Sequence, residues 1–585
     1  MKTTHFCMKR CTLGTLCTFV VSMVLGACEP PDMGNPVANP YGVVTINFDS
    51  KGADVEAEPS SITIRPPATT LDSLPVPPTR AGYTFVEWNT ASDGSGDTFN
   101  EETLIRANIL LIVYARWEPL KLDVGIAHSA ATLTPIKNGE YDERSTSLTV
   151  AVSGADVSKA AFDIHLRPVA GLSYEVARDF RENEKTFVVN VRYDGKTAFP
   201  EGAANLYVNL KTPEGYEYKG KAQSIPVKVI DGLAKTRPIP VNQTNIGHFN
   251  AYARTDGLNR HYRLMQSMEL ESPESPETSN WTAIGTEEAP FTGSFDGGGQ
   301  SIYGLSIHRP DDDDQGLFGH ISGPKAVIEN LRLEGGSVNG RGTVGGVVGR
   351  NSEGRVQNCY VSVSSRSEYR DGGTWGYGVG GVVGSNSGTV QNCYVAGEVN
   401  GNSGVGGVVG YNTGMVQNCH ARADSSGRYN VGGVVGSNSG TVQNCYATGS
   451  VYGEIQYTGG VMGVNYGGTV RNCVALNSSV TTAGGQYFIG CIGYSGSPME
   501  NNYAGCINIR YDVNRYNLGK PVTSDSTGVD GGYAMAGINP GEYNHPSFWT
   551  GTMGWNFDEV WDWSSTAHLP VLRGVASLRV LPIVP

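Results

Sequence analysis

The chain has 585 residues, which at roughly 150 residues per domain predicts three or four domains. Its formal net charge of −13 argues against a nucleic-acid partner, because such proteins need a basic surface. With 39% hydrophobic and only 17% charged residues, the chain is too apolar for wholesale disorder. Glycine is the outlier: 49 of the 78 glycines lie within 291–510, and the absence of a strict glycine at every third position excludes collagen.

Residues 1–27 have the charge order and length of an export signal, with a basic start followed by the apolar run 12–24. The run ends in Leu25, Gly26, Ala27 and Cys28, which resembles the lipobox of bacterial lipoproteins. The resemblance implies cleavage before Cys28 and lipidation of its thiol, so that residues 28–41 serve as a proline-rich tether. A short transmembrane anchor with an incidental cysteine is the alternative, but the apolar run is short for a membrane span.

Three separated motifs follow in residues 42–118: VTINFD at 44–49, PTRAGYTFVEW at 78–88 and LIVYARW at 111–117. Together they resemble the Listeria–Bacteroides repeat, also called the internalin-type B-repeat, which implies a small β-grasp-like module of bacterial surface proteins. The residues themselves suit a small aromatic core, because Tyr83, Phe85, Trp88, Tyr114 and Trp117 alternate with polar residues. A sugar-binding aromatic face is the alternative, although so small a module needs its large side chains for its own core.

Residues 119–239 show a hydrophobic period of two in five runs that are separated by turns. Alternation of this kind predicts antiparallel strands with one buried face, and the whole segment is typical of a β-sandwich. The segment contains no chemical motif, which favours a spacer.

Residues 240–580 contain a repeated unit, GGVVGxNxGxVQNC, with clear copies at 345–359, 380–393, 406–419 and 432–445. A looser copy runs over 459–473, and Cys393, Cys419 and Cys445 are spaced by 26 residues. Such a period, made of short strand-like runs between Gly, Asn and Ser, predicts a parallel β-helix of about eight coils. The repeats resemble the GLUG-motif family, and the lead-in from residue 243 and the tail to residue 573 resemble the beginning and end of its domains. We expect the repeat glycines to permit tight corners with positive φ.

Stacking the repeats in register places like residues in columns. An asparagine column at a bend is expected to form an amide ladder: Asn330, Asn358, Asn392, Asn418, Asn444, Asn472 and Asn501. The next position is expected to point inward as a column of thiols: Cys359, Cys393, Cys419, Cys445 and Cys473. The position after that is expected to point outward as an aromatic strip, the candidate contact surface: Tyr360, Tyr394, His420, Tyr446 and Tyr503.

Each column has an alternative interpretation. The cysteines are read as small buried apolar residues, with disulfides or a metal site as the alternatives; ligands placed one per coil lack the close pairing of a zinc site. The aromatic strip is either a contact surface or a solvated ladder that only stabilises the sheet. The run 311–314, four aspartates, is either a solvated acidic turn or a calcium site.

No catalytic motif is evident. The acidic residues of the repeats do not recur at one position, and none of the ten histidines is followed by glutamate, as a His-Glu-x-x-His zinc site requires. No cofactor or metal is therefore expected. The sequence predicts a mainly β, non-catalytic adhesion or interaction scaffold, lipid-anchored in the bacterial envelope at the outer membrane or cell surface, with a host-matrix, glycan or envelope partner. A carbohydrate-active β-helix enzyme and a purely structural envelope component are the alternatives.

Overall fold

The computed structural model describes residues 42–575, apart from 107–109, 123–124, 130, 137–144, 154–162, 167, 182–185, 200–201, 212–215, 219–222, 369–377, 484–488, 498–499, 506–508, 512–535 and 539. The chain divides into two compact units. The first contains Met1–Leu122 with Thr212–Glu217, and the second contains Asp123–Lys211 with Tyr218–Pro585.

The first unit is a mixed β-sheet with the strand order β2-β1-β5-β3-β4. Its strands are β1 (Val44–Asp49), β2 (Ser61–Ile64), β3 (Tyr83–Asn89), β4 (Thr98–Phe99) and β5 (Leu111–Leu122). Strand β1 pairs with β5 in parallel, whereas β2 and β3 pair with their neighbours antiparallel. Alternate residues of β1 are buried, as the period-two pattern of an amphipathic strand requires.

The aromatic core of this unit differs in part from the predicted set. Trp88 is buried and packs edge-on against Phe48, with ring centroids 4.9 Å apart. Phe85 and Trp117 are half-buried and pack against the same core. Tyr83 and Tyr114 lie outside the core cluster. The guanidinium of Arg80 lies over the ring of Tyr83, and the ammonium group of Lys51 lies over the ring of Tyr114.

The second unit begins with two four-stranded sheets, ordered β10-β11-β8-β6 and β7-β14-β12-β9. Their strands are β6 (Gly125–His128), β7 (Ala131–Leu133), β8 (Ser145–Ser153), β9 (Asp163–Leu166), β10 (Leu172–Arg181), β11 (Thr186–Tyr193), β12 (Ala203–Lys211) and β14 (Gln223–Val229). The short β13 (Tyr216–Tyr218) belongs to the sheet of the first unit, where it pairs with β5. The pairings are antiparallel except for β7 with β14. Every second residue of β11 is buried, which gives each strand one core-facing side.

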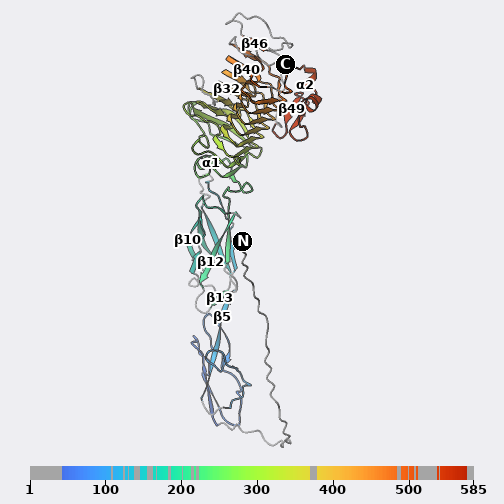
Figure 1. Ribbon diagram of the computed structural model, residues 1–585. Helices are drawn as coiled ribbons and strands as arrows, with labels where there is room; N and C mark the ends of the chain where they lie inside the picture. Colours follow the sequence, from blue (N-terminus) through green and yellow to red (C-terminus); the bar gives the residue numbers. More distant parts are fainter. Residues whose placement is uncertain are drawn as a thin grey trace, which may run out of the picture. The chain divides into compact units, whose positions relative to one another are not determined.

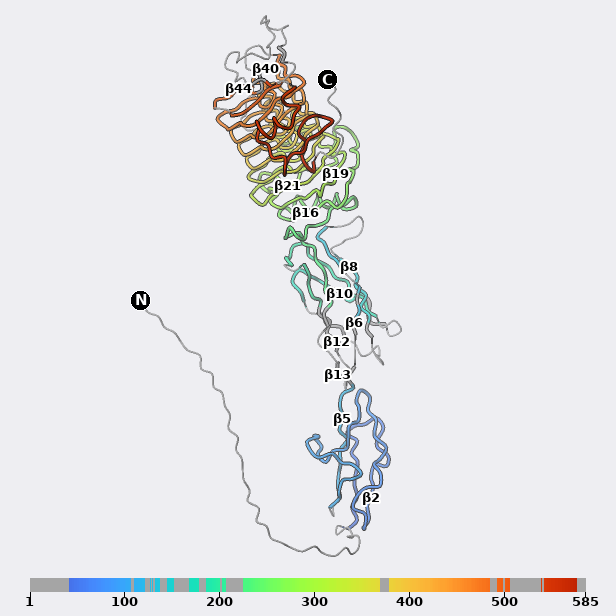
Figure 2. The backbone as a smooth tube through the Cα atoms, turned by 90° about the vertical axis from the view of Figure 1, so that its right-hand side faces the viewer, coloured from blue at the N-terminus to red at the C-terminus, as the bar shows by residue number. Residues whose placement is uncertain are grey.

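The remainder of the unit is a parallel β-solenoid, seen as stacked coils in Figures 1 and 2. One face is a nine-stranded parallel sheet: β15 (Ile239–Val241), β16 (His261–Leu264), β18 (Ser294–Asp296), β21 (Val327–Glu329), β25 (Arg355–Gln357), β30 (Thr389–Gln391), β34 (Met415–Gln417), β38 (Thr441–Gln443) and β41 (Thr469–Arg471).

The other faces form one continuous parallel sheet of 24 strands that runs around a corner. After the first corner come β17 (Met268–Glu269), β19 (Ser301–Arg309), β22 (Arg332–Gly340), β26 (Tyr360–Val361), β27 (Ser364–Ser367), β31 (Tyr394–Val395), β32 (Glu398–Gly406), β35 (His420–Ala421), β36 (Asp424–Gly432), β39 (Tyr446–Ala447), β40 (Val451–Asn465), β42 (Val474–Ala475), β43 (Val480–Thr482), β45 (Tyr503–Ala504), β46 (Ile509–Tyr511) and β47 (Ala536–Gly537). The closing side of each coil contains β20 (Phe318–Ser322), β23 (Val344–Gly345), β24 (Val348–Ser352), β28 (Val379–Gly380), β29 (Val383–Asn386), β33 (Val409–Asn412), β37 (Val435–Asn438) and β44 (Ile489–Ser495).

The repeat glycines allow the coils to stack closely, and the prediction that they adopt positive φ is wrong. A Cβ atom on Gly406 would lie 2.1 Å from the carbonyl oxygen of Val409, and one on Gly407 would lie 2.1 Å from that of Gly433. Any side chain at these positions would therefore collide with backbone of its own coil or of the next. The left-handed conformation belongs instead to the corner asparagines, such as Asn418 with φ of 53°.

Both ends of the stack carry additional structure. At the N-terminal end, α1 (Ile246–Ala253) buries Phe249 against Tyr262 and Phe295 of the first coils, with ring centroids 4.8 and 5.5 Å apart. The C-terminal segment contains α2 (Pro540–Tyr543), the π-helix η2 (Phe548–Thr552), β48 (Trp561–Ser564) and β49 (Leu569–Leu572). This segment lies along the side of the coils in both views, as the red part of Figures 1 and 2 shows. It covers a lateral face of the solenoid.

Candidate functional site

The corner asparagines form one unbroken ladder along the solenoid. Each Nδ2 donates to the Oδ1 of the preceding coil at 2.8–3.3 Å, from Asn358 to Asn501. Asn330 starts the ladder by donating to Oδ1 of Asp296 at 2.9 Å. All seven asparagines have φ between 53° and 56°, a region that asparagine tolerates better than most residues. The ladder therefore satisfies side-chain polar groups at a strained corner.

Two further ladders were not predicted from the sequence. A fully buried asparagine ladder runs along the corner that precedes the strands of the nine-stranded sheet, with Nδ2 to Oδ1 distances of 2.7–2.9 Å: Asn351, Asn386, Asn412, Asn438 and Asn465. A half-buried glutamine ladder starts at Glu329 and has Nε2 to Oε1 distances of 2.8–2.9 Å: Gln357, Gln391, Gln417 and Gln443. The asparagine of the first ladder and the glutamine of the second each occupy a fixed position in the repeated unit GGVVGxNxGxVQNC. The sequence therefore contained the signal for both ladders.

The five column cysteines point inward and are free thiols without exposed surface. Each Sγ donates to the carbonyl oxygen two residues earlier in the chain, at 3.2–3.3 Å. Contact with the Cys393 thiol and burial raise the pKa of Cys359, and burial raises the pKa of Cys393 and Cys445. Cys359, Cys393 and Cys445 are therefore held as thiols, and all five cysteines pack as small apolar residues in a dry core.

The aromatic strip points outward from the coils, but the prediction of a contact surface is wrong. Tyr446 has no exposed surface and His420 is 9% exposed, because the C-terminal segment packs over them. The Tyr446 ring lies 5.6–5.9 Å from the rings of Trp549, Trp555 and Trp561. The other strip residues, Tyr360, Tyr394 and Tyr503, are half-buried against the same cluster. The outward positions therefore form a second hydrophobic core between coils and tail.

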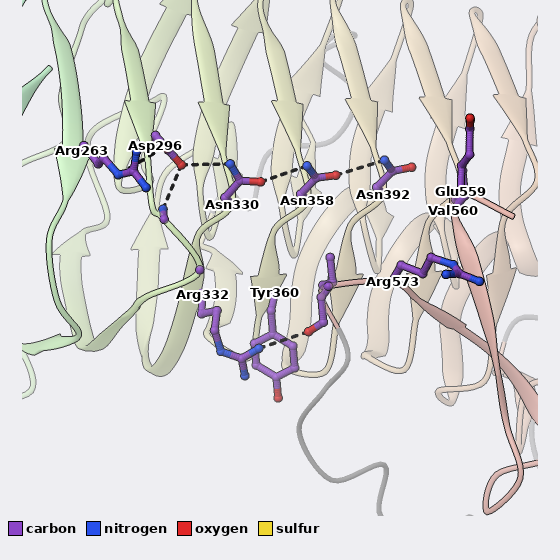
Figure 3. A pocket seen from close by; sticks show the side chains of 14 residues that line it. Arg263, Asp296, Asn330, Arg332, Asn358, Tyr360, Asn392, Glu559, Val560 and Arg573 are labelled. Atoms are coloured by element: carbon purple, nitrogen blue, oxygen red, sulfur yellow. Dashed lines mark hydrogen bonds and ion pairs between the residues drawn. The ribbon is translucent and has the colours of Figure 1, made fainter. Parts of the chain in front are cut away.

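A polar pocket lies beside this covered strip, where the coils meet the end of the C-terminal segment (Figure 3). It has a volume of about 550 Å³. Its floor includes the first rungs of the corner ladder, and its far wall comes from the tail. The lining residues are Arg263, Asp296, Gly298, Gly299, Asn330, Arg332, Asn358, Tyr360, Asn392, Glu559, Val560, Arg573, Gly574 and Val575.

Arg332 is the most buried charged group of this pocket, with 9% of its surface exposed. Its Nε donates to Oε1 of Glu334 at 3.1 Å, and its Nη1 donates to the carbonyl oxygen of Val575 at 3.2 Å. The guanidinium also lies over the ring of Tyr360, 4.3 Å from its centroid. Its Nη2 is buried and has no hydrogen-bond partner among the described residues. Strand β22 and the tail thus hold a guanidinium with one unused donor.

The four aspartates at 311–314 are partly neutralised by arginines of later coils. Asp313 forms an ion pair with Arg341, and Asp314 accepts from Nε of Arg350 at 3.0 and 3.2 Å. Among the described residues no group of three or more His, Cys, Asp or Glu side chains is arranged to hold a metal ion.

Several predicted residues lie outside the described residues. They are the lipobox positions Leu25, Gly26 and Ala27 with Cys28, and the tether as far as residue 41. No helix in the described part of the chain is both long and apolar enough to cross a membrane.

Comparisons with known families match both repeat types. Residues 45–116 match the Listeria-Bacteroides repeat domain, and residues 340–365, 401–426 and 427–452 each match the GLUG motif. Among curated proteins, halomucin of Haloquadratum walsbyi is 32% identical over 259 residues, which is 40% of this chain and 3% of halomucin. A "Putative Gly-rich membrane protein" of Evansella cellulosilytica is 31% identical over 150 residues, 25% of this chain and 17% of that protein. The similarity thus spans only a small part of these relatives.

Among solved structures, a "putative immunoglobulin A1 protease from Bacteroides ovatus" aligns with 59% of this chain and 94% of its own, at 20% identity and a TM-score of 0.40. So low a score carries no argument about function. The two family matches and the observed coils agree in their order along the chain. This protein carries one Listeria–Bacteroides repeat domain followed by a parallel β-solenoid that contains GLUG motifs.

Proposed function

We propose that the chain is a non-catalytic interaction scaffold of the bacterial cell envelope. A lipid on Cys28 would hold it there, and the solenoid would engage a host-matrix, glycan or envelope partner. The observation that carries the proposal is the continuity of the solenoid. One apolar cluster runs from the first coils to Ile492, and three amide ladders tie neighbouring coils together. Such a stack is a rigid support whose outer faces, apart from the one that the C-terminal segment covers, can make contacts.

Two further observations support this role. A relative from Evansella cellulosilytica is named a membrane protein, which favours an envelope location. The pocket carboxylates are both engaged within the chain. Asp296 accepts from the backbone N–H of Gly298 and from Asn330, and Glu559 accepts from Asn556. Acid–base catalysis on a glycoside needs two carboxyl groups directed at one bond, and these two are occupied in positioning the backbone and side chains.

The second candidate is a carbohydrate-active enzyme, which the presence of two carboxylates in one polar pocket favours. Incubation of the purified protein with a polysaccharide panel distinguishes the scaffold from the enzyme. The scaffold proposal expects binding without new reducing ends, whereas a glycoside-cleaving enzyme would produce them. A purely structural envelope component would show neither binding nor turnover.

The location is tested in cells that produce the full chain. Lipidation predicts incorporation of a palmitate analogue that is lost in Cys28→Ala and kept in Cys17→Ala, a matched cysteine within the export signal. Surface display predicts that protease added to intact cells removes the solenoid epitopes while a periplasmic marker survives. Labelling of Cys28→Ala, or full protection from protease, would contradict the respective part of the proposal.

The interaction role is tested by binding of these cells to matrix-protein and glycan arrays. Cells that carry an inactive gene serve as the control. Adhesion equal to that of the control cells on every surface would overturn the scaffold role.

A further inference from the structure

Four tyrosines lie together on the outer surface where the coils close, and they belong to none of the columns predicted from the repeat. They are Tyr411, Tyr457, Tyr466 and Tyr494, and we call them the tyrosine patch. Tyr466 is 39% exposed, and the other three are half-buried. The rings of Tyr457 and Tyr494 have centroids 5.4 Å apart. The patch is therefore a group of aromatic rings that solvent can reach.

The backbone directs two of these rings outward. Asn412 of the buried asparagine ladder points inward, so the adjacent Tyr411 points outward. Along the solenoid, Tyr411 is followed in register by Ser437, Val464 and Tyr494 on successive coils. Three steps of about 4.8 Å between neighbouring strands separate the two end tyrosines by about 14 Å. The patch is thus elongated along the solenoid axis.

The phenol groups are close to one another. Burial raises the pKa of Tyr466 and the three neighbouring phenols raise it further, whereas a hydrogen bond with the Asn430 side chain lowers it. Val464 lies in the same outward column as Tyr411 but has no exposed surface, so the patch has an apolar floor. The patch combines aromatic faces with hydroxyl and amide groups at their edges.

The positions that neighbour the patch in its two columns are uncharged. They are Ser385, Ser387, Thr413, Ser437 and Ser439. The hydroxyl residues that precede Tyr466 along the axis are exposed, and Oγ1 of Thr413 donates to Oγ of Ser387 at 2.9 Å. A row of hydroxyls therefore continues from the rings, and a charged ligand would find no opposite charge at these positions.

These features fit a sugar, because a sugar ring has an apolar C–H face and hydroxyls around its rim. Tyrosine offers an apolar body with a polar tip, and hydroxyl and amide groups can both donate and accept hydrogen bonds. We propose that the tyrosine patch binds a neutral oligosaccharide that lies along the solenoid axis, with its rings on the tyrosines and its hydroxyls on the serine and threonine row. The length of about 14 Å favours an oligosaccharide over a single sugar. The proposal rests on the interaction role above and names the chemical class of its partner.

A length series of neutral sugars tests the proposal without any mutation. The full chain, purified in a detergent without a sugar headgroup, is titrated calorimetrically with mono-, tri- and hexasaccharides of glucose, mannose, galactose and N-acetylglucosamine. We expect at least one series to bind, with an affinity that rises at least about tenfold from the monosaccharide to the hexasaccharide as more rings are contacted. This affinity should be insensitive to salt, because no charges are paired. Failure of every hexasaccharide to bind, or an affinity that does not depend on length, would overturn the proposal.

Two serine substitutions locate the site, and each introduces the residue that the preceding coil has at the same position. Tyr466→Ser copies Ser439 and Tyr411→Ser copies Ser385, so both variants should fold. We expect Tyr466→Ser to weaken binding of the hexasaccharide by about tenfold or more, as truncation of a central interface aromatic does. Tyr411→Ser, at one end of the patch, should weaken it by about threefold.

The matched control is Tyr452→Ser, which copies Ser426 of the preceding coil. Tyr452 is 45% exposed and lies outside the patch, so this variant should bind the hexasaccharide as wild type does. Unchanged binding in both patch variants, or equal losses in Tyr466→Ser and Tyr452→Ser, would refute the site. Cells that adhere to matrix protein through Tyr466, while the purified chain binds no sugar, would retain the scaffold role and refute only the saccharide.

Discussion

The hydroxyl of Tyr446 donates a hydrogen bond to the backbone carbonyl of Pro570, 124 residues later in the chain. This contact joins the outward face of a central coil to strand β49 of the tail. It explains why the aromatic strip is a core and not a contact surface, since the tail supplies the tryptophans that cover it.

Removal of the Tyr446 side chain should release the tail. We expect Tyr446→Ala to destabilise the docked tail by about 3 kcal/mol or more, because a large aromatic side chain leaves a cavity between coils and tail. Tyr446→Phe should cost about 1–2 kcal/mol, since it leaves the Pro570 carbonyl unpaired. Tryptophan fluorescence during urea titration and limited proteolysis measure both. The control is Tyr452→Ala, in the same sheet and 45% exposed, which should change stability by less than about 0.5 kcal/mol. A tail equally protected in Tyr446→Ala and Tyr452→Ala would refute this role.

We expect the buried asparagine ladder to contribute as much to the stability of the solenoid as its apolar core does. Asn412 accepts from Asn386 and donates to Asn438, both at 2.8 Å and without exposed surface. Asn412→Leu keeps the branching and the number of heavy atoms of the side chain but removes hydrogen-bond partners on two neighbouring coils, and we expect a loss of about 3 kcal/mol in the free energy of unfolding. Asn400→Leu, at an exposed site of the same coil, is the control. Thermal unfolding followed by circular dichroism measures both, and equal melting temperatures would contradict the prediction.

The thiol column should resist modification as long as the fold is intact. Because the five thiols are inaccessible, we expect no labelling of Cys359, Cys393, Cys419, Cys445 or Cys473 by maleimide at pH 8.5, and complete labelling in guanidinium. Mass spectrometry of the separate peptides distinguishes these sites from the other cysteines. Tyr452→Cys provides a matched exposed thiol, which should react in the native state. Native labelling of a column thiol, or recovery of column cysteines as disulfide-linked peptides, would show that the column is open or oxidised.

Acidification should destabilise the solenoid through His420. Burial, together with the nearby cation of Arg422, lowers the pKa of His420 to about 3, and its ring stacks on Tyr446 with centroids 3.8 Å apart. In the unfolded chain the pKa returns to about 6.5, so the unfolded state binds more protons between pH 6.5 and 3. The folded state therefore has no penalty above pH 6.5 and loses stability as the pH falls, by about 2 kcal/mol at pH 5.

The measurement is the free energy of unfolding between pH 7.5 and pH 5 in wild type, His420→Gln and His545→Gln. His545 is exposed, so its variant should retain the wild-type slope. His420→Gln should flatten the slope but not abolish it, because burial also lowers the pKa of His261 and His320. A slope identical in wild type and His420→Gln would exclude His420 as a source of the acid sensitivity.

The sequence alone determined the coil and the register of its columns. Asn, Cys and Val recur at fixed spacing in the repeat unit, and in a solenoid residues one period apart become hydrogen-bonded neighbours in space. A period in the chain therefore translates directly into a ladder, as for Asn392 and Asn418. The physical role of the glycines was misjudged, because the close approach of Gly407 to the next coil depends on the distance between coils and not on local turn chemistry.

Only the tertiary structure decided which outer face of the coils is covered by the C-terminal tail. The tail from Pro540 to Val575 has no counterpart in the repeat, so no spacing indicates which face it covers. Its docking buries Tyr446 and brings Arg573 and Val575 to a pocket that begins at Arg263. Contacts between a periodic stack and a unique segment depend on shape and packing across hundreds of residues, whereas contacts within the stack depend on local repetition. For that reason the sequence determined the scaffold, and the structure determined its buried strip and the pocket beside it.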